Sequence, residues 1–117
     1  MVDVIGTDEF ADWFESLKAT EARAVVRKVD LLELMGVALG FPHSSNIKGS
    51  QIGLRELRIQ ADGSPLRVFY AFDPIRRAVL LIGGDKTGDE RFYQRLIPDA
   101  ERLWQRYLAE IQKESKP

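Results

Sequence analysis

Three strand-like segments joined by two tight turns lie between Gly53 and Gly84, and they constrain the fold more than any other part of the chain. In the first two segments, apolar residues alternate with polar ones, and the third segment, residues 78–82, is apolar without a break. Asp62-Gly63 and Asp73-Pro74 separate the segments and supply residue types that tight turns require. Period-two alternation between turns predicts two successive antiparallel hairpins. The alternating apolar positions are Leu57, Ile59, Leu66, Val68, Tyr70 and Phe72.

Helical periodicity is present on both sides of this meander. Thr7 is a favourable N-cap for a first helix, and Thr20 can cap a second helix that ends near Gly36. After the meander, Asp89 can cap a last helix in which Pro98 is expected to kink or delay the first turns. The apolar stripes that predict these helices contain Phe10, Trp13, Phe14, Leu17; Val25, Val29, Leu32; and Phe92, Leu96, Ala100, Leu103, Trp104, Tyr107, Ile111.

The predicted order is a short strand at residues 2–5, two helices, three antiparallel strands and a helix, with a loop over residues 42–51. This order belongs to the α+β class, in which we expect helices to cover one face of a small twisted sheet and the other face to stay open. The chain has 117 residues and is 44% hydrophobic, which suffices for one core. We therefore expect a single domain over residues 1–117.

Composition excludes several classes of protein. The chain has no cysteine and one histidine, His43, so neither a disulfide nor a thiolate or histidine-cluster metal site is expected, and no cofactor is predicted. Its longest apolar run is far shorter than the roughly 20 residues that cross a bilayer. The first ten residues include acidic side chains and no basic ones, unlike a signal peptide. We expect a cytoplasmic protein that does not associate with membranes.

The net charge of −1 conceals an asymmetry between the two halves of the chain. Residues 1–47 contain eight acidic and four basic residues, whereas residues 48–95 contain nine basic and six acidic residues. A basic meander favours an anionic partner. Lysines and arginines that merely deter edge-to-edge pairing of strands would produce the same pattern, so both interpretations stay open.

Two segments resemble a known family: IKGSQIGLRELRI and SPLRVFYAFDPIRRAVLLIGGDKTGDERFYQRLIPDAERL. They resemble the RelE/ParE superfamily of bacterial toxins, in particular the HigB-like branch that includes phage-derived host-killing proteins. The resemblance covers nearly the whole chain and implies a RelE-like domain, with an N-terminal strand and helical hairpin packed on an antiparallel meander and a C-terminal helix. It also implies a type II toxin that cleaves messenger RNA on the ribosome. The implied partner is a helix-turn-helix antitoxin, in a hetero-oligomer.

Cleavage of RNA through its own 2′-oxygen needs an acceptor for the hydroxyl proton, cations that stabilise the charged phosphorane, and an acid near the leaving 5′-oxygen. The resemblance implies that Arg67 faces the scissile phosphate, where a guanidinium can bind two phosphate oxygens at once. It further implies cations after the last strand and a tyrosine that stacks on a base or transfers a proton. The expected catalytic residues are Arg67, Lys86, Arg91 and Tyr93, and the expected RNA-binding residues are Lys48, Arg55 and Arg58.

Other interpretations of these residues remain open at this stage. Arg67 could be an edge arginine paired with Glu56, and Tyr93 could simply pack the last helix beside Phe92. No residue is identified as the general base. Related ParE toxins poison DNA gyrase, and a non-catalytic antitoxin-binding or nucleic-acid-binding module is a further alternative. The joint presence of Arg67, Lys86 and Tyr93 favours the ribonuclease, and on this interpretation we expect Arg67 to contribute little to stability.

Overall fold

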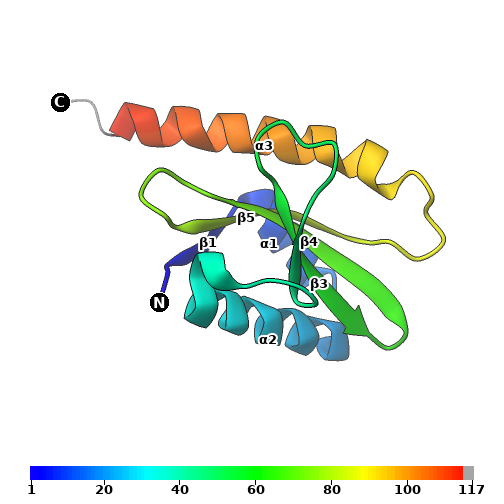
Figure 1. Ribbon diagram of the computed structural model, residues 1–117. Coiled ribbons are helices and arrows are strands. Elements are labelled where there is room, and N and C mark those ends of the chain that lie inside the picture. The colour runs from blue at the N-terminus through cyan, green and yellow to red at the C-terminus, as the bar shows by residue number, and fades with distance from the viewer. Residues whose placement is uncertain (115–117) are drawn as a thin grey trace.

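A five-stranded sheet forms the middle layer of the computed structural model, which describes residues 1–114 (Figure 1). The strand order is β1-β5-β4-β3-β2, with β1 parallel to β5 and every other pair antiparallel. Along the chain the elements are β1 (Val4–Gly6), α1 (Asp8–Glu15), α2 (Ala19–Met35), a 3₁₀ turn η1 (Gly36–Ala38), β2 (Ser44–Asn46), β3 (Arg55–Ala61), β4 (Ser64–Phe72), β5 (Ala78–Asp85) and α3 (Phe92–Glu114). The predicted α+β class and both hairpins are confirmed.

Helices cover both faces of the sheet, so the expectation that one face stays open is wrong. One face carries Leu57, Val68 and Leu80 and packs against α1 and α2. The opposite face carries Phe69 and Leu81 and packs against α3; Figure 1 shows α2 and α3 on opposite sides of the sheet. The reason is that most residues of β4 and β5 are apolar on both faces, and a strand of this kind needs cover on both sides.

The helix ends follow the predictions in part. The hydroxyl of Thr7 caps α1 as predicted and accepts a hydrogen bond from the Phe10 N–H at 3.0 Å. α2 begins one residue before Thr20, and the Glu21 carboxylate accepts from the Lys18 N–H at 2.9 Å. The Thr20 hydroxyl instead donates to the Asp62 carboxylate in the β3–β4 turn. The predicted cap at Thr20 is therefore wrong, and Thr20 ties α2 to a hairpin.

Two further elements differ from the expectations. α3 begins at Phe92 and continues through Pro98, so the proline does not delay its start. The segment predicted as a loop over residues 42–51 contains β2, which pairs with the first half of β3. The Ser-Ser-Asn sequence of β2 has no apolar alternation, so the sequence pattern could not predict it.

Within residues 1–114, no helix is both long and apolar enough to cross a bilayer.

Two adjacent glycines in β5 allow helices to approach the sheet closely on both sides. A Cβ atom on Gly83 would lie 2.3 Å from the ring of Trp13 in α1, and one on Gly84 would lie 2.8 Å from the ring of Phe92 in α3. Real Cβ atoms do not approach other carbon atoms this closely. The aromatic rings of both helices therefore occupy the space that side chains at Gly83 and Gly84 would fill, and this close packing places the start of α3 over β4 and β5.

We predict that Trp104→Ala lowers the free energy of unfolding by about 3 to 5 kcal/mol. Trp104 lies in the α3 core, is 7% exposed, and stacks on Tyr107 with ring centroids 5.7 Å apart. Urea unfolding of the wild type and the variant measures the loss. Gln105→Ala, at an exposed position of the same helix, is the matched control and should change stability by about 0.5 kcal/mol or less. Equal effects of the two substitutions would contradict this role of Trp104.

Candidate active site

A buried carboxylate, Glu56, lies at the centre of the charged residues on the α3 side of the sheet. Its side chain contacts four others, although the residue is only 5% exposed. Oε1 accepts a hydrogen bond from the Tyr93 hydroxyl at 2.6 Å and lies 3.4 Å from Nε of Arg67. Oε2 accepts from the Ser45 hydroxyl at 3.0 Å and lies 3.9 Å from a guanidinium nitrogen of Arg58. We call these residues, together with Lys86, the Glu56 cluster.

The sheet register explains why these side chains meet. Arg58 on β3 and Arg67 on β4 are direct cross-strand partners, and Ser45 on β2 is the partner of Glu56. Two like charges directly opposite each other destabilise a sheet. Glu56 precedes Arg58 by two residues, so its side chain projects from the same face and is diagonal to Arg67. Its carboxylate therefore offsets the repulsion between the two arginines.

Arg67 both supports the structure and lines an open groove. It is 6% exposed, and one terminal nitrogen donates to the Leu66 carbonyl at 2.9 Å. Its Nε, 3.4 Å from Glu56, has no hydrogen-bond partner among the described residues, so the contact is an ion pair without a good hydrogen bond. The pairing with Glu56 considered from the sequence is thus present. Removing one partner of a buried ion pair leaves the other charge buried and unpaired, which is costly. In contrast to the expectation from the sequence, we therefore expect Arg67 to contribute to stability.

Tyr93 is held in the cluster by packing on three sides. Its ring stacks on Phe69 with centroids 5.8 Å apart, and Phe92 meets it edge-on. The Lys86 ammonium lies 5.1 Å from the ring centroid and 3.5 Å from the hydroxyl. Burial, and then the hydrogen bond to Glu56, raise the pKa of Tyr93 to about 12. Tyr93 therefore remains protonated at neutral pH and acts as a hydrogen-bond donor to Glu56. The packing of Tyr93 beside Phe92 that was considered from the sequence is present.

The remaining sequence-predicted residues lie outside the Glu56 cluster. Arg55 shares the α2 side of β3 with Leu57 and donates to the Tyr70 hydroxyl at 3.3 Å and to the Leu39 carbonyl at 3.1 Å. Alternation along the strand thus directs Arg55 away from the cluster. Arg91 is exposed; its backbone N–H donates to the Asp89 side chain, and its carbonyl accepts from the Arg95 N–H.

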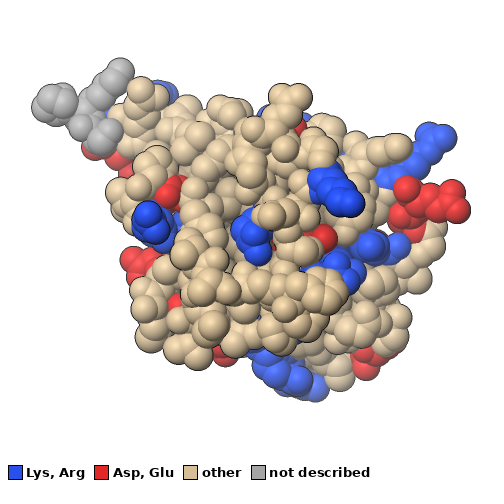
Figure 2. Space-filling view, viewed as in Figure 1, with Lys and Arg blue, Asp and Glu red and all other residues tan. Residues whose placement is uncertain are grey.

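Two grooves meet at Arg58, which lines both of them. The Tyr93 groove, about 400 Å³ in volume, is lined by Ser45, Glu56, Arg58 and Tyr93 of the cluster and by the exposed Lys48. The Lys28 groove, about 560 Å³, lies at the open edge of β3 beside α2 and reaches Arg67. On the face shown in Figure 2, basic side chains form separate groups, with uncharged surface and acidic side chains between them. The site is therefore characterised by individual cations held in the two grooves. Basic residues do not form a continuous stripe on this face.

Sequence reasoning did not identify Glu56 or Ser45 as site residues. Counting two residues back from Arg58 along a period-two strand could have placed Glu56 on the same face as the arginine. Nothing in the sequence predicted that β2 brings Ser45 across from Glu56.

Within residues 1–114, no three His, Cys, Asp or Glu side chains gather as metal ligands.

Comparison with known proteins gives matches over most of the chain. Residues 12–105 match the family described as phage derived protein Gp49-like (DUF891). The chain is 38% identical over 99 residues to the candidate toxin HigB3 of Mycobacterium tuberculosis (strain ATCC 25618 / H37Rv), a match that covers 83% of this chain and 85% of HigB3. It is 31% identical over 113 residues to the candidate toxin HigB2 of the same organism, covering 94% of this chain and 56% of HigB2.

A solved structure supports the same fold. A chain of the archaeal RelE-RelB complex from Pyrococcus horikoshii OT3 superposes with a TM-score of 0.54, covering 74% of this chain and 97% of that chain. At 18% sequence identity, this likeness shows the fold alone. The family match, the relatives and the fold agree with the resemblance found in the sequence: this chain belongs to the phage-derived Gp49-like family, is HigB-like in sequence and has a RelE-like fold.

Proposed function

We propose that this type II toxin cleaves messenger RNA on the ribosome and that the Glu56 cluster is its active site. The observation that carries the proposal is a carboxylate hydrogen-bonded to Tyr93 and flanked by Arg58 and Arg67 beside an open groove. This arrangement combines a proton acceptor with fixed positive charge, which are two of the requirements of cleavage through the 2′-oxygen. The toxin names of the relatives, HigB3 and HigB2, support the same function class.

Each residue of the cluster has a proposed role in the reaction. The Glu56 carboxylate accepts the 2′-hydroxyl proton while the 2′-oxygen attacks phosphorus and the bond from phosphorus to the 5′-oxygen breaks. The products are a 2′,3′-cyclic phosphate and a 5′-hydroxyl. Arg67 and Arg58 stabilise the charge that develops on the phosphorane. Lys86 supplies further charge and a proton for the leaving oxygen, and Tyr93 orients the carboxylate and the substrate.

The ribosome is part of the proposal because the site holds only a weak base. A carboxylate is far less basic than the 2′-alkoxide it helps to form, so Glu56 alone cannot make free RNA a good substrate. Holding the 2′-oxygen in line with the leaving group can contribute about 7 to 11 kcal/mol. A messenger strand fixed in the ribosome would supply this orientation, and we expect free RNA to be cleaved poorly.

The antitoxin is the second proposed partner. Residues 48–95 carry nine basic and six acidic residues, and the groove cations Lys48 and Arg58 are accessible. A toxin must be kept inactive until needed, and covering the Glu56 cluster would achieve this directly. We propose that an acidic segment of the antitoxin that pairs with this toxin lies over the Tyr93 groove.

The first test of the function is Glu56→Gln, which keeps the size of the side chain but removes its basicity. Cleavage should fall about 100- to 10,000-fold, the usual contribution of a positioned general base. The assay is a reconstituted translation complex in excess chelator, with cleavage ends mapped by primer extension. Arg67→Lys should also lower the rate, because it loses the planar guanidinium. Glu90→Gln, at an exposed position outside the cluster, is the matched control.

Urea unfolding of each variant separates loss of activity from loss of fold. A Glu56→Gln variant that cleaves at the wild-type rate would show that another group accepts the proton. Intact message with the wild type, together with stalled supercoiling by DNA gyrase, would show that the chain is a ParE-like gyrase poison and that these roles are wrong.

A second prediction concerns the alkaline stability of the cluster. The pKa of Tyr93 is raised to about 12 in the folded protein, above the ordinary tyrosine value of 10.0. A raised pKa means that folding favours the protonated phenol, so the contribution of Tyr93 is complete below pH 10 and is lost as the pH rises toward 12. Tyr93→Phe should remove this part of the alkaline loss of stability. The measurements are urea unfolding from pH 8 to pH 11 and tyrosinate absorbance; identical pH profiles for both proteins would contradict the assignment.

A third prediction concerns antitoxin binding. Association with the antitoxin encoded beside this toxin should become faster as salt is lowered, because opposite charges steer the encounter. Arg58→Glu should slow association and reduce its salt dependence. Arg102→Glu, which changes an exposed arginine paired with Asp99 on α3, is the control. Stopped-flow measurements over a salt series decide the matter, and an equal effect of the two substitutions would argue against binding over the Tyr93 groove.

A further inference from the structure

We propose that the Lys28 groove, with Phe41 on its rim, is a second nucleotide-binding subsite that holds the message next to the scissile phosphate. The inference rests on the proposed ribonuclease function and extends it to residues on α2 and in the η1–β2 loop. Its ligand is a single-stranded nucleotide, bound through a phosphate in the groove and a base on the Phe41 ring. Neither the sequence pattern nor the Glu56 cluster assigns a role to Arg27, Lys28 or Phe41.

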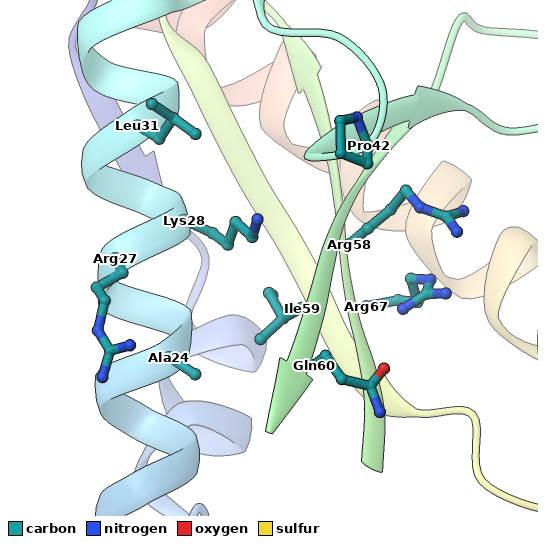
Figure 3. Close-up of a pocket in the computed structure, with 9 residues that line it drawn as sticks. All are labelled: Ala24, Arg27, Lys28, Leu31, Pro42, Arg58, Ile59, Gln60 and Arg67. Carbon is teal, nitrogen blue, oxygen red and sulfur yellow. The ribbon is translucent and has the colours of Figure 1, made fainter. Parts of the chain in front are cut away.

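The charged residues that line the groove are all cations. They are Arg27 and Lys28 from α2, Arg58 from β3 and Arg67 from β4, and no carboxylate is among the lining residues. Figure 3 shows the Lys28 side chain directed from α2 toward β3, with Arg58 and Arg67 beyond the strand. Arg58 and Arg67 share Glu56 as a counter-ion, whereas no carboxylate lines the groove beside Arg27 and Lys28. A groove with more positive than negative charge attracts an anion, and a phosphate meets this requirement.

Lys28 is the cation best prepared to bind an anion. Its ammonium lies 2.7 Å from Nδ1 of His43, an acceptor that carries no negative charge. Burial lowers the pKa of Lys28, which shows that the charged form has lost hydration without the compensation of a carboxylate. A phosphate oxygen in the groove would supply the missing negative charge. Among the described residues, the Lys28 ammonium contacts a neutral acceptor and forms no ion pair with a carboxylate.

Phe41 provides the second, independent observation. Phe41 is 74% exposed and directly precedes Pro42 on the groove wall. The Arg58 guanidinium carbon lies 5.0 Å from the ring centroid. Aromatic rings and guanidinium planes are the surfaces on which unpaired RNA bases stack. An exposed ring beside an arginine on the edge of a cationic groove therefore fits a nucleobase.

Continuity with the Glu56 cluster decides between a nucleotide and an acidic peptide. Arg58 lines both grooves and contacts Glu56 in one and Phe41 in the other, and Arg67 joins the Glu56 cluster to the Lys28 groove. Because Arg58 lines both grooves, a strand with its scissile phosphate at the Glu56 cluster can extend past Arg58 into the Lys28 groove, where Arg27 and Lys28 supply further positive charge. An acidic peptide would use the charges but gives no reason for an exposed aromatic ring between them.

The experiment uses a short single-stranded RNA that cannot be cleaved because every ribose carries a 2′-O-methyl group. One base is 2-aminopurine, whose fluorescence is quenched when it stacks. The probe should bind the wild type with quenching, and Phe41→Tyr should behave likewise. Phe41→Leu should lose the quenching and bind roughly 5- to 150-fold more weakly, the range expected for one base stacked on an aromatic ring. Ile75→Leu, at an exposed position in the β4–β5 turn, is the control.

The groove cations are tested in the same assay. Arg27→Gln and Lys28→Gln should weaken binding and make it less dependent on salt, since each removes one phosphate contact. Arg23→Gln, one turn earlier on α2 and outside the groove lining, is the matched control. If neither substitution has more effect than Arg23→Gln, the groove does not bind phosphate and the inference is overturned.

The outcomes separate this inference from the ribonuclease proposal. Unchanged probe binding by Phe41→Leu, or no binding by the wild type, overturns the subsite even if the wild type cleaves ribosome-bound message. Quenching that depends on Phe41, in a protein that leaves message intact, supports the nucleotide subsite and contradicts the ribonuclease. If Phe41→Leu weakens binding of the antitoxin and not of the probe, the groove binds an acidic peptide and the inference is wrong.

Discussion

The pairing of Glu56 with two arginines is the constraint on which the candidate site depends. Arg58 and Arg67 stand directly opposite each other on adjacent strands, in a sheet that is otherwise largely apolar on both faces. Such a pair is tolerated only with a counter-charge, and Glu56 supplies it at 5% exposure. The carboxylate in turn needs hydrogen-bond donors, which Ser45 and Tyr93 provide. β2 and the first turn of α3 are thereby held at the same point of the sheet.

The same arrangement explains why the site is open although the core is closed. α3 packs its apolar residues on β4 and β5, where Phe69, Val79 and Leu81 face it. On β3 the corresponding face presents Glu56 and Arg58. A charged surface offers α3 no apolar area to bury, so the helix covers only part of the sheet. The Tyr93 groove therefore lies where the apolar surface on the α3 side of the sheet ends. The Glu56 cluster occupies the charged surface beyond that point.

Much of the fold could be predicted because its patterns are local. Alternation along β3 and β4, the turns between the strands and the cap at Thr7 each depend on neighbouring residues. β2 could not be predicted, since Ser44 to Asn46 is a strand only through pairing with β3. The cover on the second face was missed because the apolar residues between the alternating positions of β4, such as Phe69, were not counted as a second face.

Only some residues of the candidate site could be predicted from the sequence. Arg67, Lys86 and Tyr93 were found through resemblance, and the structure brings all three together. Glu56 was considered only as a structural partner for Arg67, because an acidic residue between basic ones looks like simple charge compensation. Arg55 illustrates the limit of sequence proximity. It lies one residue from Glu56 in sequence, yet strand alternation places its side chain on the other face, where it binds Tyr70 and Ser44.

Structural and catalytic interpretations of the Glu56 cluster are compatible because one charge can serve both purposes. In the free toxin, Glu56 offsets the repulsion between Arg58 and Arg67, so the arginines are held in place before any substrate arrives. A bound phosphate would bring its own negative charge to the arginines and make Glu56 less necessary as their counter-ion. The carboxylate would then be available to accept a proton, while the cations remain fixed around the phosphate. Preorganised charge of this kind stabilises a transition state without reorganisation at the moment of reaction. The burial that makes the cluster costly to assemble is thus also what would make it effective.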